Sequence, residues 1–106
     1  MHNIDQTKKY VEKVAAVKGW ILNPDKEFTQ GVIEGLCNNE KKLGCFLCPC
    51  RESSGKKEKD RDIVCPCAYA QEDIQEFGHC YCALFLAPEF AATKKEPQSI
   101  PERRNQ

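Results

Sequence analysis

Residues 48–82 read CPCRESSGKKEKDRDIVCPCAYAQEDIQEFGHCYC, and this stretch decides what the chain can be. Six of the eight cysteines fall within these 35 residues, which is more than packing requires. They form three pairs whose members lie two positions apart: Cys48 and Cys50, Cys65 and Cys67, Cys80 and Cys82. A metal site or iron cluster usually takes four protein sulfurs. The two that remain suffice for one dithiol that cycles to a disulfide. Spacing alone does not say which four sulfurs would bind metal.

The motif order C-P-C, C-P-C, C-x-C continues directly into Ala83-Leu84-Phe85-Leu86-Ala87-Pro88. Upstream of the first motif lie Val32-Ile33-Glu34-Gly35-Leu36 and Leu43-Gly44. Together these segments resemble the catalytic (beta) subunit of ferredoxin:thioredoxin reductase and its bacterial and archaeal relatives, over roughly residues 7–90. The resemblance implies a divergent member of that family. It also implies a small, mainly α domain whose short helices and loops fold around a [4Fe-4S] cluster.

The same resemblance implies how the six cysteines divide. By motif position, the cluster ligands would be Cys48, Cys65, Cys67 and Cys80. Cys50 and Cys82 would form the redox disulfide beside the cluster, with Cys50 attacking the partner's disulfide and Cys82 staying close to the cluster. A cluster beside the disulfide would stabilise the half-reduced state. This matters because ferredoxins deliver single electrons, a disulfide takes two, and a lone thiyl radical is high in energy.

The implied function is an iron–sulfur disulfide reductase. Electrons would pass one at a time from ferredoxin through the [4Fe-4S] cluster to the disulfide, and on to a thioredoxin or thioredoxin-like protein. A second, non-catalytic subunit is a further possible partner.

The chain departs from the family pattern in two ways. The family usually has C-H-C as its third pair, whereas this chain has Tyr81 between the cysteines, and its nearest histidine is His79. We therefore take His79 as the candidate catalytic proton carrier, with a merely hydrogen-bonded histidine as the alternative. The gaps between the pairs are 14 and 12 residues, the first shorter and the second longer than in the plant and cyanobacterial enzymes. Surface loops absorb such changes at low entropic cost.

Composition narrows the class of protein. A chain of 106 residues supports one domain, and 16 basic against 16 acidic residues give no global attraction to nucleic acid or an anionic membrane. The N-terminus carries no apolar run typical of a signal peptide, which predicts a cytoplasmic protein without a membrane span. Eight cysteines without an export signal favour metal binding or redox catalysis over a disulfide framework.

Apolar periodicity predicts a helix over residues 7–18, capped by Asp5 or Thr7 and stopped by Gly19. The predicted apolar stripe of this helix consists of Tyr10, Val11, Val14 and Val17. Residues 20–22 read as a buried connector, followed by a turn at Asn23-Pro24-Asp25.

A second helix is predicted from Asp25 to about Lys42, ending at Leu43-Gly44. Its predicted apolar face consists of Phe28, Val32, Ile33 and Leu36. Residues 51–62 contain no apolar side chain and indicate a solvated loop with one short helical turn. A short helical pattern lies within residues 68–77 and ends at Gly78.

The domain prediction is a single reductase-like domain over residues 1–93 and a polar, extended or disordered tail over residues 94–106. Two further cysteines precede the signature. Cys37 lies in the second predicted helix, where an ordinary buried thiol is the expected role. Cys45 forms a C-x-x-C with Cys48, a spacing common in zinc ribbons and redox pairs, although the resemblance starts the reactive set at Cys48.

Two other functions fit the same cysteines. One is a non-catalytic zinc module that uses cysteines from the same pairs. The other is a simple electron carrier, whose cluster is real but whose Cys50 and Cys82 never turn over.

Overall fold

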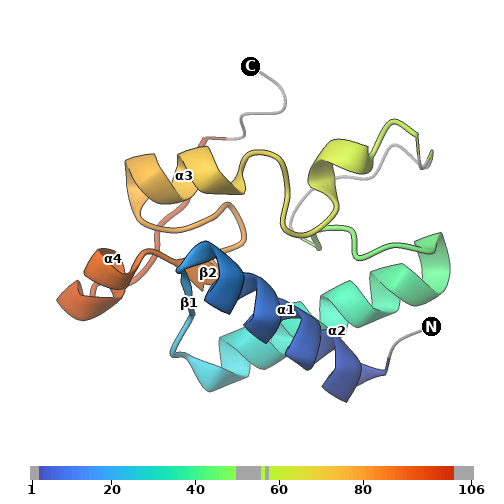
Figure 1. The fold of residues 1–106 in the computed structure, drawn as a ribbon, viewed down its shortest axis with the longest axis horizontal. Coiled ribbons are helices and arrows are strands. Elements are labelled where there is room, and N and C mark those ends of the chain that lie inside the picture. The colour runs from blue at the N-terminus through green and yellow to red at the C-terminus, as the bar shows by residue number, and fades with distance from the viewer. Residues whose placement is uncertain (1–2, 50–55, 57, 102–106) are drawn as a thin grey trace.

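Two antiparallel helices at the N-terminus form one side of the molecule, and a run of short elements that carries the cysteine pairs packs against them (Figure 1). The computed structural model describes residues 3–49, 56 and 58–101. Four α-helices occur in this part: α1 (Ile4–Lys18), α2 (Lys26–Leu43), α3 (Ala70–Phe77) and α4 (Pro88–Thr93). A 3-10 helix spans Arg61–Ile63, and two short strands are β1 (Ile21–Leu22) and β2 (Phe85–Leu86). The expectation of a small, mainly helical fold is confirmed.

Helix α1 begins earlier than the sequence pattern predicts. Its N-cap is Asn3, not Asp5 or Thr7: the Asn3 side chain accepts from the Gln6 backbone N–H, and the Gln6 side chain accepts from the Asn3 N–H. This reciprocal pair is a capping box, in which amide side chains replace the usual hydroxyl and carboxylate. Gly19 ends the helix in the left-handed conformation, as predicted.

Helix α2 follows the expected turn closely. Asp25 caps its N-terminus by accepting from the Phe28 N–H, and Gly44 ends it with φ +81°. Val32, Ile33 and Leu36 are buried, but the expected apolar face is too wide, because Phe28 is 42 % exposed. Val17 of α1 was also assigned wrongly to the buried stripe and is 72 % exposed.

The two strands are the part of the fold that periodicity misses. Residues Ile21–Leu22 pair antiparallel with Phe85–Leu86, so the connector after α1 is a half-exposed strand and not a buried link. Two residues are too few to show an alternating pattern. The pairing brings the segment after the third cysteine pair back beside α1 and α2.

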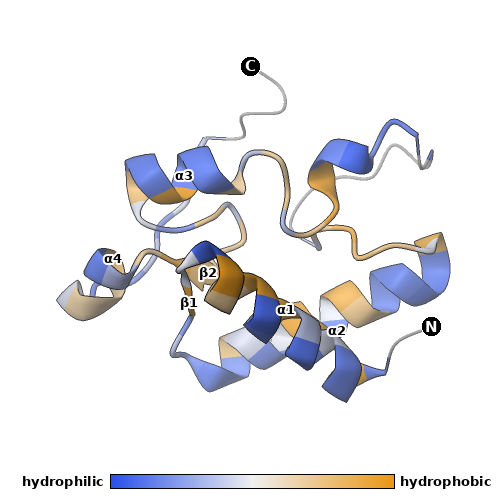
Figure 2. Ribbon diagram, viewed as in Figure 1, coloured by the Kyte–Doolittle hydropathy of each residue, from blue (hydrophilic) through white to orange (hydrophobic). Residues whose placement is uncertain are grey.

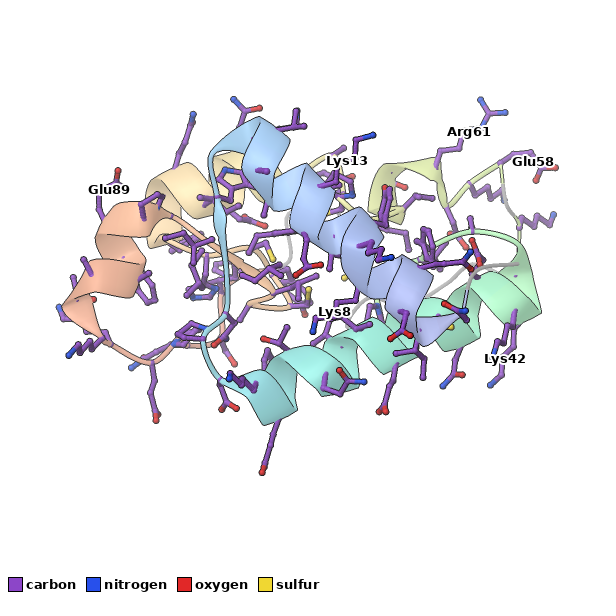
Figure 3. The ribbon with its side chains drawn as sticks, turned by 60° about the horizontal axis from the view of Figure 1, so that its bottom comes forward. Lys8, Lys13, Lys42, Glu58, Arg61 and Glu89 are labelled. Atoms are coloured by element: carbon purple, nitrogen blue, oxygen red, sulfur yellow. The ribbon has the colours of Figure 1, made fainter. Side chains whose placement is uncertain are left out.

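The apolar core lies between the α1–α2 layer and the cysteine-bearing segments. In Figure 2 the apolar faces of these helices turn toward the centre of the molecule, and their polar faces turn out. Figure 3 shows the sulfur atoms in the same interior, while charged side chains such as Lys42, Arg61 and Glu89 project outward. The buried cluster includes Val11, Ile33, Leu36, Phe85 and four of the signature cysteines. The cysteine site is therefore part of the core.

Helix α3 starts at Ala70 and stops at Gly78, close to the predicted bounds, whereas α4 was not predicted. The short helical turn expected in the polar loop corresponds to the 3-10 helix at its end, and half of that loop lies outside the described residues. None of the helices in the described part combines the length and the apolarity needed to cross a bilayer.

Candidate functional site

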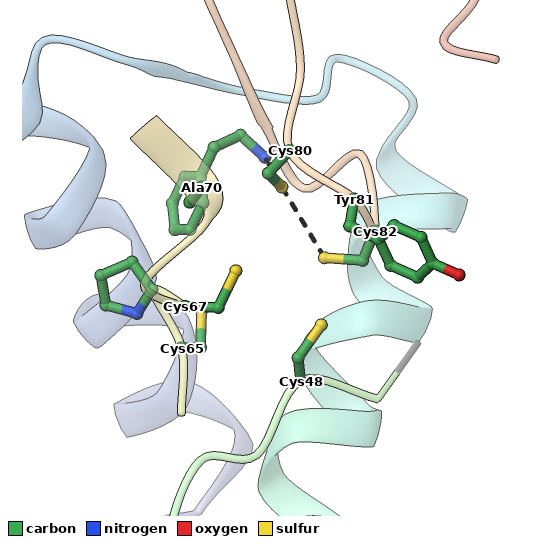
Figure 4. Close-up of a pocket in the computed structure, with 9 residues that line it drawn as sticks. Cys48, Cys65, Cys67, Ala70, Cys80, Tyr81 and Cys82 are labelled. Atoms are coloured by element: carbon green, nitrogen blue, oxygen red, sulfur yellow. Dashed lines mark hydrogen bonds between the residues drawn. The ribbon is translucent and has the colours of Figure 1, made fainter. Parts of the chain in front are cut away.

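Five signature cysteines from three separate segments line one cavity: Cys48, Cys65, Cys67, Cys80 and Cys82 (Figure 4). Pro66, Ala70, Tyr81 and Phe85 complete the lining. The sixth signature cysteine, Cys50, lies outside the described residues. The cavity has no charged side chain on its described wall, and of the five cysteines that line it all except Cys67 are buried.

The first two C-P-C segments are held together by backbone pairing. Leu47 and Val64 form an antiparallel bridge, the Cys48 N–H donates to Ile63 O at 2.9 Å, and the Cys65 N–H donates to Phe46 O at 2.7 Å. Because these bonds flank both cysteines, they fix Cys48 and Cys65 on the same side of the cavity.

Two contacts from the helical layer position these segments further. The Tyr10 hydroxyl of α1 donates to the Cys65 carbonyl at 2.6 Å, and its ring stacks on Phe46 with centroids 4.8 Å apart. Burial and the nearby Cys65 thiol raise the pKa of Tyr10 above its ordinary value, so the phenol stays protonated and able to donate. On α2, Gly35 leaves room for Pro49, because a Cβ at position 35 would lie 2.9 Å from the Cβ of Pro49.

The third pair sits on a tight loop that turns back into β2. The Cys80 N–H donates to Phe85 O at 3.0 Å, and the Ala83 N–H donates to Cys80 O at 2.9 Å. Ala83 has a φ of +59°, an uncommon conformation for a residue with a side chain. Asn23 holds the loop from outside, since its side-chain amide donates to Ala83 O at 3.0 Å.

Hydrogen bonds to sulfur within this loop change the pKa of the Cys80 thiol. Cys80 Sγ lies 3.8 Å from Cys82 Sγ and accepts a hydrogen bond from the Phe85 N–H at 3.4 Å. The Cys82 thiol and the backbone N–H groups of Phe85 and Leu84 lower the pKa of Cys80, although burial opposes them. Cys80 is therefore biased toward the thiolate form.

The Cys65 thiol behaves in the opposite way. Burial raises its pKa well above the ordinary value, and the neighbouring Cys80, Cys48 and Cys67 raise it further. Several thiolates facing one dry cavity repel one another, so they cannot all ionise unless a cation shares the space. Soft thiolates converging on an apolar cavity are the donor set that iron–sulfur clusters and zinc take. Within the described ranges, no three His, Cys, Asp or Glu side chains converge on a single metal-ion position, so these sulfurs line a space instead of surrounding one point.

His79 lies outside this lining. It is 2 % exposed, its Nδ1 is 2.8 Å from Cys80 O, and its Nε2 accepts from the Gln98 N–H at 3.3 Å. The ring packs edge-on against Phe90, with centroids 5.5 Å apart. The structure thus turns the imidazole toward α4 and the C-terminal segment, and a role in proton transfer stays a prediction.

The two extra cysteines also stand apart from the cavity. Cys37 is buried in α2, as expected for an ordinary core thiol. Cys45 is half-buried and does not line the cavity, so its C-x-x-C spacing with Cys48 does not bring it into the sulfur set.

Sequence reasoning missed Tyr10, Gly35 and Asn23, which position the cysteine segments without carrying metal-binding chemistry. Only Gly35 left a signal, because a glycine inside a predicted helix costs stability and usually has a packing reason.

Comparison with known proteins agrees with this geometry. The family model described as "Ferredoxin thioredoxin reductase catalytic beta chain" matches residues 1–104. The chain belongs to this family. It is similar to the catalytic chain of ferredoxin-thioredoxin reductase from Porphyra purpurea, with 35 % identity over 82 % of this chain and 72 % of the relative. It is also similar to the Synechocystis catalytic chain, with 34 % identity over 89 % of this chain and 77 % of the relative.

A chloroplastic catalytic chain from Spinacia oleracea is 34 % identical over 82 % of this chain, and this match spans 57 % of the spinach protein. The plant protein therefore contains a large part that has no counterpart in the matched region. All three relatives are named as catalytic chains of a reductase, which places the chain among the oxidoreductases.

Proposed function

We propose that this protein is a ferredoxin-dependent disulfide reductase that reduces a thioredoxin or thioredoxin-like protein. The observation that carries the proposal is the convergence of cysteines from all three C-x-C pairs on one buried cavity, in a chain of the reductase's catalytic family. In the proposed division, Cys48, Cys65, Cys67 and Cys80 hold a [4Fe-4S] cluster, and Cys50 and Cys82 form the redox disulfide.

The residues on the cavity wall fit such a group. Four thiols from three tethered segments supply the ligands, and the apolar Pro66, Ala70 and Phe85 keep the space dry. The Phe85 N–H directed at Cys80 Sγ is the kind of hydrogen bond that tunes a cluster's potential. When bound, the cluster would supply single-electron transfer next to the disulfide.

The chain's own cysteines then carry the two-electron chemistry. Two electrons and two protons convert the Cys50–Cys82 disulfide into two thiols. The Cys50 thiolate attacks one sulfur of the partner's disulfide, which forms a mixed disulfide and releases the partner's other sulfur as a thiolate. Cys82 then attacks Cys50 Sγ, restores the original disulfide and releases the second partner thiol. The position of Cys82, 3.8 Å from Cys80, supports its assignment to the sulfur that stays beside the cluster.

The energetics and shape are compatible with two partners. A ferredoxin at about −400 mV and a thioredoxin at about −270 mV differ by ~130 mV, or ~6 kcal/mol over two electrons. The molecule measures 37 × 34 × 23 Å, and this thin shape suits a protein that partners approach from two opposite faces. We propose that ferredoxin and the thioredoxin-like acceptor approach these different faces, and that a second, non-catalytic subunit can accompany the chain.

The decisive experiment is reduction of candidate thioredoxins by reduced ferredoxin, comparing the wild type with Cys50→Ser. Cys45→Ser is the matched control, since Cys45 precedes the signature and does not line the cavity. We expect turnover in the wild type and in Cys45→Ser, and loss of turnover in Cys50→Ser with iron retained. Equal activity in Cys50→Ser and the wild type would contradict the proposal.

Metal analysis separates the alternatives. The proposed reductase is brown, contains iron and inorganic sulfide in near-equal amounts, and has one disulfide that blocks alkylation of two cysteines. A colourless protein that contains zinc would establish the zinc module instead. A brown protein with two permanently free thiols and no activity toward disulfides would establish the simple electron carrier.

The catalytic assignment of His79 is tested separately by His79→Ala. Turnover and cluster behaviour that match the wild type would remove His79 from the proton-transfer role.

A further inference from the structure

His79 is a buried bridge between the third cysteine loop and the C-terminal segment, which also line a common groove at Ala83 and residues 95–97. One ring nitrogen faces the carbonyl of Cys80, at 2.8 Å, and the other faces the backbone N–H of Gln98, at 3.3 Å. A carbonyl can only accept and a backbone N–H can only donate, so both contacts are satisfied when the imidazole carries its proton on Nδ1. The ring therefore donates to the cysteine loop and accepts from the C-terminal segment at the same time.

The carbonyl that His79 contacts is a key atom of the third cysteine loop. Cys80 O also accepts from the Ala83 N–H at 2.9 Å, and this bond closes the turn that contains Cys82. Ala83 is held at a φ of +59°, which costs free energy and persists only where surrounding contacts enforce it. By donating to Cys80 O, His79 Nδ1 holds in place the carbonyl that accepts from the Ala83 N–H.

The C-terminal segment, residues 95–100, covers the other side of the imidazole, and we call it the C-terminal strap. It shares a groove with Phe77, His79 and Phe90. Helix α4 packs so closely on the start of the third cysteine loop that a Cβ at Gly78 would overlap the Phe90 ring. The strap and α4 together leave His79 only 2 % exposed, and the strap donates a hydrogen bond to the ring from the Gln98 N–H.

We propose that His79 is a positioning residue through which the C-terminal strap holds the turn carrying Cys80 and Cys82. Seating of the strap thereby sets the exposure and reactivity of Cys82. The consequence for turnover rests on the proposed function, whereas the coupling itself concerns only described residues. A partner that lifts the strap would loosen the Cys82 turn.

Backbone-directed variants at the strap test the coupling. Gln98→Pro removes the N–H that donates to His79, whereas Gln98→Ala keeps that N–H and removes only the side chain. Ser99→Pro controls for proline in the strap. Amide hydrogen exchange by mass spectrometry is measured on the reduced full chain, purified anaerobically with whatever metal or cluster it binds. We expect exchange within residues 80–86 to rise roughly three- to tenfold in Gln98→Pro only, the range that loss of one hydrogen bond gives. Exchange within residues 8–18 should match the wild type.

Two conservative replacements of His79 separate its two contacts. In His79→Asn, the amide nitrogen occupies the place of Nδ1 and can still donate to Cys80 O, but no acceptor reaches the Gln98 N–H. In His79→Gln, the amide oxygen occupies the place of Nε2 and can still accept from the Gln98 N–H, but the donor to Cys80 O is lost. These variants keep the test valid if Gln98→Pro fails to fold.

Alkylation provides a second readout that a general loss of stability would not produce. We expect the rate of Cys82 alkylation, relative to that of the buried Cys37 of α2 in the same reduced protein, to rise at least about threefold in Gln98→Pro, His79→Asn and His79→Gln. Both His79 variants should match because the coupling needs both contacts. The proposal is overturned if the strap exchanges faster while exchange in residues 80–86 and the ratio of Cys82 to Cys37 alkylation stay at wild-type values. It is also overturned if His79→Asn behaves as the wild type.

These results separate the inference from the proposed function. A wild type that fails to reduce thioredoxin refutes the reductase but leaves the exchange and alkylation comparisons interpretable. If the wild type reduces thioredoxin but the strap variants leave the third cysteine loop unchanged, only the positioning role of His79 is refuted.

Discussion

The Tyr10 hydroxyl donates a 2.6 Å hydrogen bond to the Cys65 carbonyl, across 55 residues of sequence. This bond ties the middle of α1 to the second C-P-C segment, whose two cysteines line the cavity. The N-terminal helix therefore takes part in building the site, although it contributes no sulfur to it.

Replacement of Tyr10 by Phe should loosen that segment. The variant keeps the stacking on Phe46 and loses only the hydroxyl, so we expect a loss of about 1 kcal/mol of stability, seen as a Tm lower by about 4–8 °C. The visible absorbance of the proposed cluster should also bleach faster in air. Tyr10→Leu, which loses the stacking as well, should be more destabilised; an unchanged Tm and bleaching rate in Tyr10→Phe would contradict this account.

Gly35→Ala should displace the first C-P-C segment from α2. The added methyl group would lie 2.9 Å from the Pro49 Cβ and 3.2 Å from its Cγ, closer than stable contacts allow. We expect a loss of about 1–3 kcal/mol in thermal or urea unfolding, together with less iron per chain.

Gly31→Ala, in the same helix, is the matched control because nothing lies within 4 Å of its added Cβ. There the better helix propensity of alanine should raise stability by roughly 0.5–1 kcal/mol. Stabilisation by both substitutions would show that Pro49 does not pack against Gly35.

Gly78→Ala should cost more than Gly19→Ala, although both glycines end helices with positive φ. At Gly19 the new Cβ meets nothing within 4 Å, so only the left-handed conformation is penalised, by about 1–2 kcal/mol. At Gly78 the Cβ would also overlap the Phe90 ring, so α4 or the third cysteine loop must move.

Thermal unfolding of the two variants measures the difference. In the double variant Gly78→Ala/Phe90→Ala the overlap is absent, and we expect the penalty of Gly78→Ala in that background to approach that of Gly19→Ala. A cost at Gly78 that is independent of Phe90 would contradict the proposed overlap.

Asn23→Asp should release the turn that carries Cys82. Aspartate keeps the oxygen that accepts from the Asp25 N–H but loses the amide that donates to Ala83 O. We expect a loss of about 1–3 kcal/mol, because the Ala83 carbonyl loses its donor and faces a carboxylate. Faster amide exchange should be confined to residues near 83.

Asn23→Ser is a useful comparison, since its hydroxyl can still accept from Asp25 but is too short to reach Ala83. Equal stability of Asn23→Asp and the wild type would show that the Asn23–Ala83 bond does not hold the turn.

Local chemistry allowed the sequence to predict much of the helical framework. Gly19, Gly44 and Gly78 end their helices with positive φ, because a glycine there relieves the strain that any other residue would bear. The Asn23-Pro24-Asp25 turn and the buried Val32, Ile33 and Leu36 were likewise expected. By contrast, α4 and the two strands are too short to produce a periodic signal.

The sequence by itself determined the family of this protein, and its six cysteines in three C-x-C pairs predicted the kind of site. Only the tertiary structure decided which other residues serve that site. The links from Tyr10 to Cys65, Asn23 to Ala83 and His79 to Gln98 each join segments that are far apart in sequence or lack any shared motif. Motif spacing records which side chains can bind or react, whereas hydrogen bonds and close packing between distant segments depend on how the whole chain folds.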